Sequence, residues 1–136
     1  IIKKIKKIFK NKIKNMIFGI WGLAFKPGTD DMREAPSINI INFLIKEGAK
    51  INVFDPVAQN EARKIFSNNI NYCNSPTKTI ENCDALIILT EWKEFRSPDF
   101  KRMKKMIKTS TIFDGRNLYD PEQVRSEGLI YYAIGR

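Results

Sequence analysis

Short apolar runs recur along the chain, separated by polar stretches rich in turn-forming residues. Five of them have the length of strands and a weaker one completes the series: residues 17–21, 51–54, 86–89, 112–113, 129–133 and, weakly, 70–72. These runs are apolar throughout, whereas strands of a sheet with one solvent-exposed face would show alternating apolar and polar residues. The pattern therefore predicts parallel strands that are covered on both faces.

Helical patterns fill the gaps between the runs. Ser37 is expected to cap a helix over residues 38–47, and Gly48 stands where a helix commonly ends. Asp55, followed by a proline, is expected to cap a helix over 57–66. Further helical stretches are predicted at 77–82, at 99–107 and from Asp120-Pro121 onward. The alternation predicts an α/β fold with a Rossmann-like, open and mostly parallel sheet, helices on both faces, and a helical segment in front.

The segment in front, residues 1–15, has a composition of its own. Its apolar residues recur at helical spacing, and it holds seven lysines and no acid. The whole chain of 136 residues has a net charge of +9, so only +2 remains for residues 16–136. Two interpretations stay open: an anchor for a membrane surface or nucleic acid, and the last turns of a longer linking helix. Because the chain starts with isoleucine, we favour the linking helix and expect residues 16–136 to form one domain.

The cysteines and the absence of histidine restrict the possible chemistry. Cys73 and Cys83 are ten residues apart and the chain has no histidine, so the spacing matches no zinc signature and no metal site is expected. Two reduced thiols indicate a cytoplasmic protein. Neither cysteine has a base beside it in the sequence, and Gly19 and Gly22 miss the spacing of a dinucleotide fingerprint. A small NAD enzyme complete in itself is therefore the weakest interpretation.

Ligands of such sheets bind at the carboxyl ends of the strands, so the loops there hold the candidate residues. Lys26 and Arg33 flank a Pro-Gly turn with two aspartates, and they offer a point charge and a planar fork suited to phosphate. Arg116 follows an Asp-Gly turn after another strand and would lie over the same edge. Solvated, incidental charges are the alternative in each loop. Trp92 is expected to pack in the interior more than to stack on a base.

Four stretches in this order give a specific resemblance: "GLAFKPGTDDMREAPS", "VFDP", "CDALIILTEWKEF" and "IFDGRN". Residues 16–136 resemble the C-terminal, UDP-binding domain of the UDP-glucose/GDP-mannose dehydrogenase family, and most of all its UDP-glucose 6-dehydrogenase branch. The resemblance implies an enzyme that uses NAD to oxidise UDP-glucose to UDP-glucuronate in two hydride transfers. It also implies an N-terminal domain that holds most of the NAD, a long linking helix, and a homodimer or higher homo-oligomer.

The resemblance also assigns roles to individual residues. Phe25, Lys26 and Arg116 match substrate-contacting residues of the family, and Arg33 matches an arginine that reaches the NAD. The family's glycine-rich segment with the catalytic cysteine has no counterpart here, so we expect no catalytic residue in this chain and no turnover by it alone. Relatives acting on GDP-mannose or UDP-N-acetylmannosamine share "GLAFKP" or close variants and remain alternatives. No nucleic-acid or membrane partner is expected, and a non-enzymatic module that binds through the basic helix is the remaining alternative.

Overall fold

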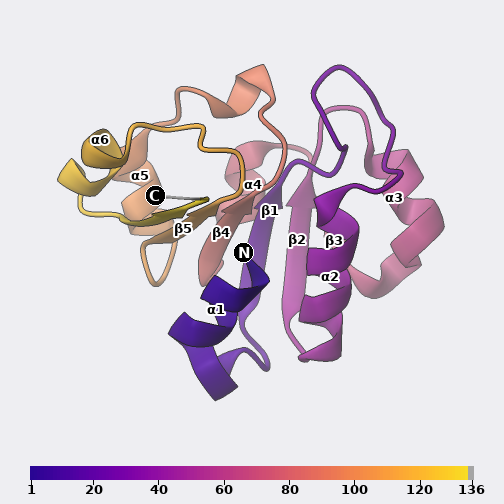
Figure 1. Cartoon of the computed structure of the whole chain (residues 1–136), viewed down its shortest axis with the longest axis horizontal. Coiled ribbons are helices and arrows are strands. Elements are labelled where there is room, and N and C mark those ends of the chain that lie inside the picture. The colour runs from indigo at the N-terminus through magenta and orange to yellow at the C-terminus, as the bar shows by residue number, and fades with distance from the viewer. Residues whose placement is uncertain (135–136) are drawn as a thin grey trace.

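One open, parallel sheet organises the structure, a computed structural model that describes residues 1–134 (Figure 1). Within these residues the strand order is β3-β2-β1-β4-β5-β6, and every neighbouring pair is parallel. This is the order of Rossmann folds, so the predicted fold class is confirmed. The strands are β1 Ile17–Trp21, β2 Lys50–Phe54, β3 Asn71–Tyr72, β4 Ala85–Ile88, β5 Thr111–Asp114 and β6 Ile130–Ala133.

Helices cover both faces of the sheet, and each face has its own apolar core. Along β1, Phe18 and Ile20 contribute to one core while Trp21 contributes to the other, because successive side chains point to opposite faces. The first core lies under α1 Ile2–Phe9, α2 Pro36–Lys46 and α3 Gln59–Phe66. The second lies under α4 Pro76–Ile80, α5 Phe100–Met106 and α6 Pro121–Ser126. Short 3₁₀ turns occupy Lys10–Lys12, Ser67–Asn69 and Lys93–Phe95.

The basic segment forms a shorter helix than the sequence pattern predicts, and this helix packs on the sheet. α1 ends at Phe9 and a 3₁₀ turn follows. The Phe9 ring lies edge-on against Phe18 and Phe113, with ring centroids 5.9 Å apart in both pairs. The Lys4 ammonium donates a hydrogen bond to the carbonyl of Ala133, at the end of β6. The apolar stripe of the helix is thus buried in this domain, and the remaining lysines face the solvent.

Two of the predicted helix caps need correction. α2 begins two residues earlier than expected, with Ala35 as its N-cap and Pro36 as its first residue. The Ser37 hydroxyl is buried and donates instead to the carbonyl of Leu23, 2.6 Å away. Asp55 does not cap α3 either, since that helix begins at Gln59 with Ala58 as its N-cap.

Other predicted ends are confirmed. Gly48 follows α2 with a φ of +82°, the left-handed conformation that glycine adopts without strain. Asp120 caps α6 as predicted, and Asp99, predicted only as the first residue of a helical stretch, caps α5; each accepts a hydrogen bond from a backbone N–H in the first turn of its helix. No helix within residues 1–134 is both long and apolar enough to cross a bilayer.

Candidate functional site at the carboxyl edge of the sheet

The loops that leave the carboxyl ends of the strands gather along one edge of the sheet (Figure 1). The loop after β1 leads to α2 on one face, whereas the loop after the neighbouring β4 leads to α5 on the other face. The two loops therefore lead to opposite faces of the sheet, although Ala24 and Thr90 near their starts are hydrogen-bonded to each other. The point where the strand order reverses in this way is the usual ligand site of open α/β sheets.

The carboxylate of Asp55, in the loop after β2, holds several of these loops together. Its Oδ2 atom accepts hydrogen bonds from the backbone N–H groups of Leu23 and Ala24, at 2.8 and 3.1 Å. Its Oδ1 atom accepts from the N–H groups of Val57 and Ala58, at 2.9 and 2.8 Å. Asp55 is only 3% exposed. It therefore stabilises two loops at once, a larger role than the local cap that its sequence context predicts.

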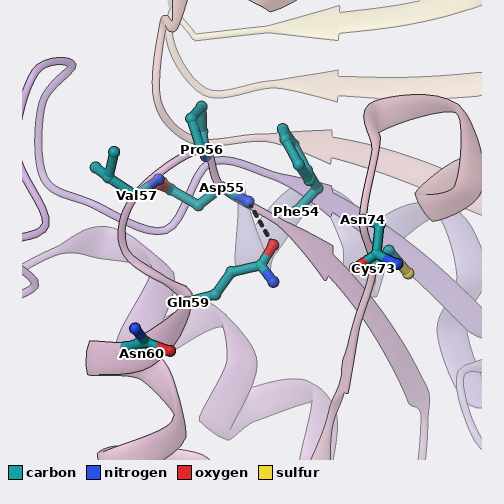
Figure 2. Close-up of a pocket in the computed structure, with 8 residues that line it drawn as sticks. All are labelled: Phe54, Asp55, Pro56, Val57, Gln59, Asn60, Cys73 and Asn74. Atoms are coloured by element: carbon teal, nitrogen blue, oxygen red, sulfur yellow. Dashed lines mark hydrogen bonds between the residues drawn. The ribbon is translucent and has the colours of Figure 1, made fainter.

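A hollow beside Asp55 lies where an acidic residue of a dinucleotide-binding fold would meet a ribose. Figure 2 shows its lining, which includes Gln59 from α3 and Asn74 from the loop after β3. The Gln59 amide oxygen accepts the backbone N–H of Asp55 at 3.1 Å. Both carboxylate oxygens of Asp55 already accept backbone N–H groups, so the carboxylate is occupied by hydrogen bonds within the protein. This geometry favours a structural role for Asp55 over that of a ribose ligand.

The loop after β1 also approaches the end of β4 very closely. The Thr90 hydroxyl is buried and donates to the carbonyl of Ala24 at 2.6 Å. Gly22 has a φ of +96°, and a Cβ at this position would lie 2.6 Å from the backbone nitrogen of Thr90. Glycine is therefore required at position 22 on both counts. Gly19 also packs closely, since a Cβ at this position would lie 2.9 Å from the carbonyl oxygen of Thr79 in α4, so both glycines permit close packing.

Phe25 and Lys26 follow this tightly packed segment and stand at the surface. The Phe25 ring is 36% exposed, unusually open for a large apolar side chain, and the Lys26 ammonium lies 5.4 Å from its centroid. The backbone N–H of Phe25 donates to the carbonyl of Asp31, which closes the loop on itself. The loop thus presents an aromatic face and a cation together at the carboxyl edge of the sheet.

Arg33 lies farther along the same loop and is paired with Asp31. Its Nη2 atom is 2.7 Å from Asp31 Oδ2, and its Nε atom also donates to this carboxylate. The backbone N–H of Arg33 adds a third bond, so the predicted side-chain to backbone turn exists at Asp31. The hydrogen bonds from Arg33 lower the pKa of Asp31 to about 2. The Arg33 side chain is nevertheless 90% exposed, and its guanidinium stands out in the solvent.

Arg116 is held in the loop after β5 by two carboxylates. The buried Asp114 accepts its backbone N–H at 2.9 Å, and also accepts the hydroxyl of Tyr131 at 2.5 Å. The Arg116 guanidinium donates from Nε and Nη2 to the Oε2 atom of Glu91, at 3.1 and 2.8 Å. Burial raises the pKa of the Glu91 carboxyl, but the bonds from Arg116 and its positive charge outweigh this effect, so the pKa lies below its ordinary value.

Three consecutive residues after β4 therefore connect the other loops of this edge. Thr90 bonds to the loop after β1, and Glu91 bonds to Arg116 in the loop after β5. Trp92 is buried and donates its indole N–H to Asp55 Oδ2 at 3.1 Å. The expectation that Trp92 packs in the interior is confirmed. Thr90 and Glu91 were not singled out from the residue pattern, because their partners are far away in the sequence.

Cys73 lines the hollow beside Asp55, Cys83 is buried in the core of the other face, and both thiols are free. Burial raises the pKa of the Cys83 thiol to about 12, and burial also raises the pKa of Cys73. Raised values keep a thiol protonated and poorly nucleophilic at neutral pH. Within residues 1–134, no group of His, Cys, Asp or Glu side chains is placed to hold a metal ion.

The strand order, together with the cationic loops beside the switch point, is typical of nucleotide-binding α/β domains. Residues 19–121 match the UDP-binding domain of the UDP-glucose/GDP-mannose dehydrogenase family, which is most of the chain. The chain therefore belongs to this family, as its UDP-binding domain.

Individual relatives agree with this assignment. The chain is 39% identical over 134 residues to a UDP-glucose 6-dehydrogenase of Pseudomonas aeruginosa, covering 95% of this chain and 30% of the relative. It is 38% identical over 124 residues to one of Bacillus subtilis, covering 91% and 27%. The chain thus spans about 30% of the length of these curated relatives.

Solved structures give the same answer for the fold. A UDP-glucose dehydrogenase of Pyrobaculum islandicum superimposes with a TM-score of 0.80 at 27% identity, over 96% of this chain and 28% of that one. A UDP-D-ManNAc dehydrogenase of Pyrococcus horikoshii gives 0.73 at 26%, over 99% and 29%. A shikimate dehydrogenase of Aquifex aeolicus, at 16% identity and a TM-score of 0.68, shares the fold alone.

Proposed function

We propose that this chain is the UDP-binding domain of an NAD-dependent UDP-glucose 6-dehydrogenase, an enzyme that oxidises UDP-glucose to UDP-glucuronate in two hydride transfers. Phe25, Lys26 and Arg116 bind the substrate, and Arg33 reaches the NAD. The NAD is held mainly by a domain outside this chain, which also supplies the catalytic cysteine. The enzyme works in the cytoplasm as a homodimer or higher homo-oligomer.

The observation that carries this proposal is the convergence of two cationic loops on one edge. Lys26 comes from the loop after β1 and Arg116 from the loop after β5, and β4 lies between these strands. Thr90 and Glu91, at the end of β4, bond to the two loops and hold them in place. A diphosphate requires two or more positive groups, and a lysine with a forked arginine supplies them. The exposed Phe25 ring beside Lys26 adds an apolar contact surface.

The position of α1 supports a linking helix for residues 1–15. Ile1 lies beside Gly115 in the loop after β5, and it lines a groove together with Pro36 and Ile134. The helix then runs from this edge along the sheet (Figure 1). A chain that precedes Ile1 would therefore enter at the edge that carries the site. A second domain placed there would face the exposed guanidinium of Arg33, as a shared NAD site requires.

UDP-glucose is the preferred substrate of this proposal because the curated relatives quoted above carry that name. A structural relative named as a UDP-D-ManNAc dehydrogenase keeps the acetamido sugar as an alternative. We infer that this domain recognises the uridine diphosphate, whereas the residues that recognise the sugar lie largely outside this chain.

UDP binding by single-residue variants of this chain tests the proposal. UDP should bind the wild-type chain, and Lys26→Ala or Arg116→Ala should each weaken it by about tenfold, the effect of one charge-assisted hydrogen bond. Lys50→Ala is the matched control, because Lys50 is an exposed lysine at the start of β2, on the opposite edge of the sheet. Equal affinity of all four chains for UDP would contradict the proposed site.

Enzyme assays test the proposal that the NAD-binding domain and the catalytic cysteine lie outside this chain. The whole enzyme that carries this domain should form two NADH per UDP-glucose, and residues 1–136 alone should form none. NADH production by the chain alone would favour the small self-contained NAD enzyme instead.

A further inference from the structure

We propose that Glu91 is a positioning residue that fixes the Arg116 guanidinium with one defined edge toward the diphosphate. This inference rests on the proposed function, because it concerns how the same site holds its ligand. Glu91 itself does not touch the nucleotide in this account. It acts through Arg116, and the two residues lie 25 positions apart on neighbouring loops.

The hydrogen bonds determine which edge of the guanidinium is used by the protein. Arg116 donates from Nε and from Nη2, both to Glu91 Oε2. These two nitrogens form the side edge of the planar fork. Nη1 and the second hydrogen of Nη2 form its end edge, and this edge can donate two parallel bonds to two phosphate oxygens. Glu91 therefore leaves the end edge for the anion.

Both partners of this ion pair are themselves fixed. Glu91 lies between Thr90 and Trp92, and each of these neighbours is buried and hydrogen-bonded to another loop. The backbone of Arg116 is fixed by the hydrogen bond that its N–H donates to the carboxylate of the buried Asp114. The guanidinium is thus oriented before a ligand binds, which reduces the side-chain conformational entropy that is lost on binding.

The environment of Glu91 favours a fixed role over a mobile one. Its side chain is 26% exposed and that of Arg116 is 31% exposed, so the pair is partly withdrawn from water. Its Oε1 atom is buried and has no hydrogen-bond partner within the described residues. Swinging Glu91 aside to admit a phosphate would also break both bonds to Arg116. The geometry therefore favours a ligand that adds to the pair over one that displaces Glu91.

A positioning role makes a prediction opposite to that of simple charge repulsion. Glu91→Ala should weaken UDP binding by about tenfold, because the guanidinium loses its orientation. Glu91→Gln keeps an acceptor oxygen at the same reach and should bind UDP within about threefold of wild type or better. If Glu91 merely opposed the diphosphate by its charge, both variants would bind UDP more tightly, and that result would overturn the proposal.

A double-mutant cycle tests whether Glu91 affects UDP binding through Arg116. In chains that already carry Arg116→Ala, adding Glu91→Ala should change the UDP affinity by less than about twofold, because no guanidinium remains to be oriented. A further tenfold loss in that background would mean that Glu91 acts on the ligand or on the fold, and the proposal would fail. Urea unfolding of each variant shows whether the domain is intact, and Glu91→Asp, too short to reach, replaces Glu91→Ala if that variant does not fold.

A spectroscopic readout separates this inference from the proposed function. The Nε–H group of Arg116 should give a protected NMR signal in the free wild-type chain and in Glu91→Gln, and should lose it in Glu91→Ala. Addition of UDP should move the Nη signals more than the Nε signal. Failure of wild type to bind UDP would overturn the proposed function, whereas an unprotected Nε–H in the free chain would overturn the role of Glu91.

Discussion

Trp92 donates its indole N–H to the Oδ2 atom of Asp55, 3.1 Å away, and thereby joins the loop after β4 to the loop after β2. The same oxygen accepts two backbone N–H groups of the loop after β1. One buried carboxylate thus holds three loops of the carboxyl edge in a single arrangement. The loop after β1 carries Lys26 and the loop after β4 holds Arg116 through Glu91, so the geometry of the candidate site depends on Asp55, a residue outside the predicted ligand contacts.

Replacing Asp55 should therefore destabilise the domain strongly. Asp55→Ala leaves five N–H donors without their acceptor, and we expect a loss of about 3 kcal/mol or more in the free energy of unfolding. Asp55→Asn, which retains one acceptor oxygen, should cost less. Urea unfolding followed by tryptophan fluorescence measures both.

Asp30→Ala is the control for Asp55, since Asp30 is an exposed aspartate in the loop after β1. It should change the unfolding free energy by no more than about 0.5 kcal/mol. Similar stabilities for Asp55→Ala and Asp30→Ala would contradict the role given to Asp55.

Helix α1 is expected to be part of the folded domain. Phe9→Ala removes a ring that contacts Phe18 and Phe113 in the buried core, and should cost about 3–5 kcal/mol of unfolding free energy. Lys7→Ala, on the exposed face of the same helix, should be close to neutral. Thermal or urea unfolding compares the two. If Phe9→Ala were as stable as Lys7→Ala, α1 would be a loosely attached segment that is free to bind elsewhere.

The ion pair in the loop after β1 predicts an unusual titration. Asp31 should titrate with a pKa of about 2, because the Arg33 guanidinium bonds to its carboxylate. A pKa that is lower in the folded state means that the pair stabilises the fold above the ordinary pKa of aspartate. That contribution is lost as the pH falls from about 4 towards 2.

Carbon-detected NMR of the Asp31 carboxyl carbon measures this directly. Arg33→Ala should return the Asp31 pKa towards its ordinary value, whereas Lys50→Ala should leave it unchanged. An ordinary Asp31 pKa in the wild-type chain would show that the ion pair does not persist in solution.

The two thiols should react with a disulfide reagent at different rates. Burial keeps the pKa of Cys83 near 12, so Cys83 should react at pH 8 only when the chain unfolds. Cys73 is partly exposed and should react first, although its raised pKa makes it slower than a free thiol. Mass spectrometry of peptides from the labelled native and urea-unfolded chains assigns each site. Rapid labelling of native Cys83 would contradict the burial that excludes it as a nucleophile.

The strands were the most predictable part of the structure from sequence. Their apolar runs reflect burial on both faces, and the boundaries of β4 and β5 differ from the predicted ones by one residue at each end. The helix cap at Asp120 was also predicted, because a cap depends on neighbours within one turn, whereas the same kind of local pattern gave wrong caps at Ser37 and Asp55.

The connections between the loops were not predictable in the same way. Asp55 carries the local pattern of a cap, yet its partners Leu23 and Trp92 are 32 and 37 residues away. Glu91 has no pattern that distinguishes it from a solvated glutamate, and only the alignment of β4 beside β5 brings it to Arg116. The motifs indicated the cationic residues of the candidate site, whereas the residues that hold those loops in place could be found only from the fold.

Titration of the isotope-labelled chain with UDP, and separately with GDP, followed by amide chemical shifts, would show whether the carboxyl edge binds uridine diphosphate. We expect UDP-selective shifts at the amides of Lys26, Arg116 and their neighbours, with none at Lys50. A preference for GDP would contradict the uridine assignment. Shifts absent from the carboxyl edge, or centred on the lysines of α1, would contradict the site itself.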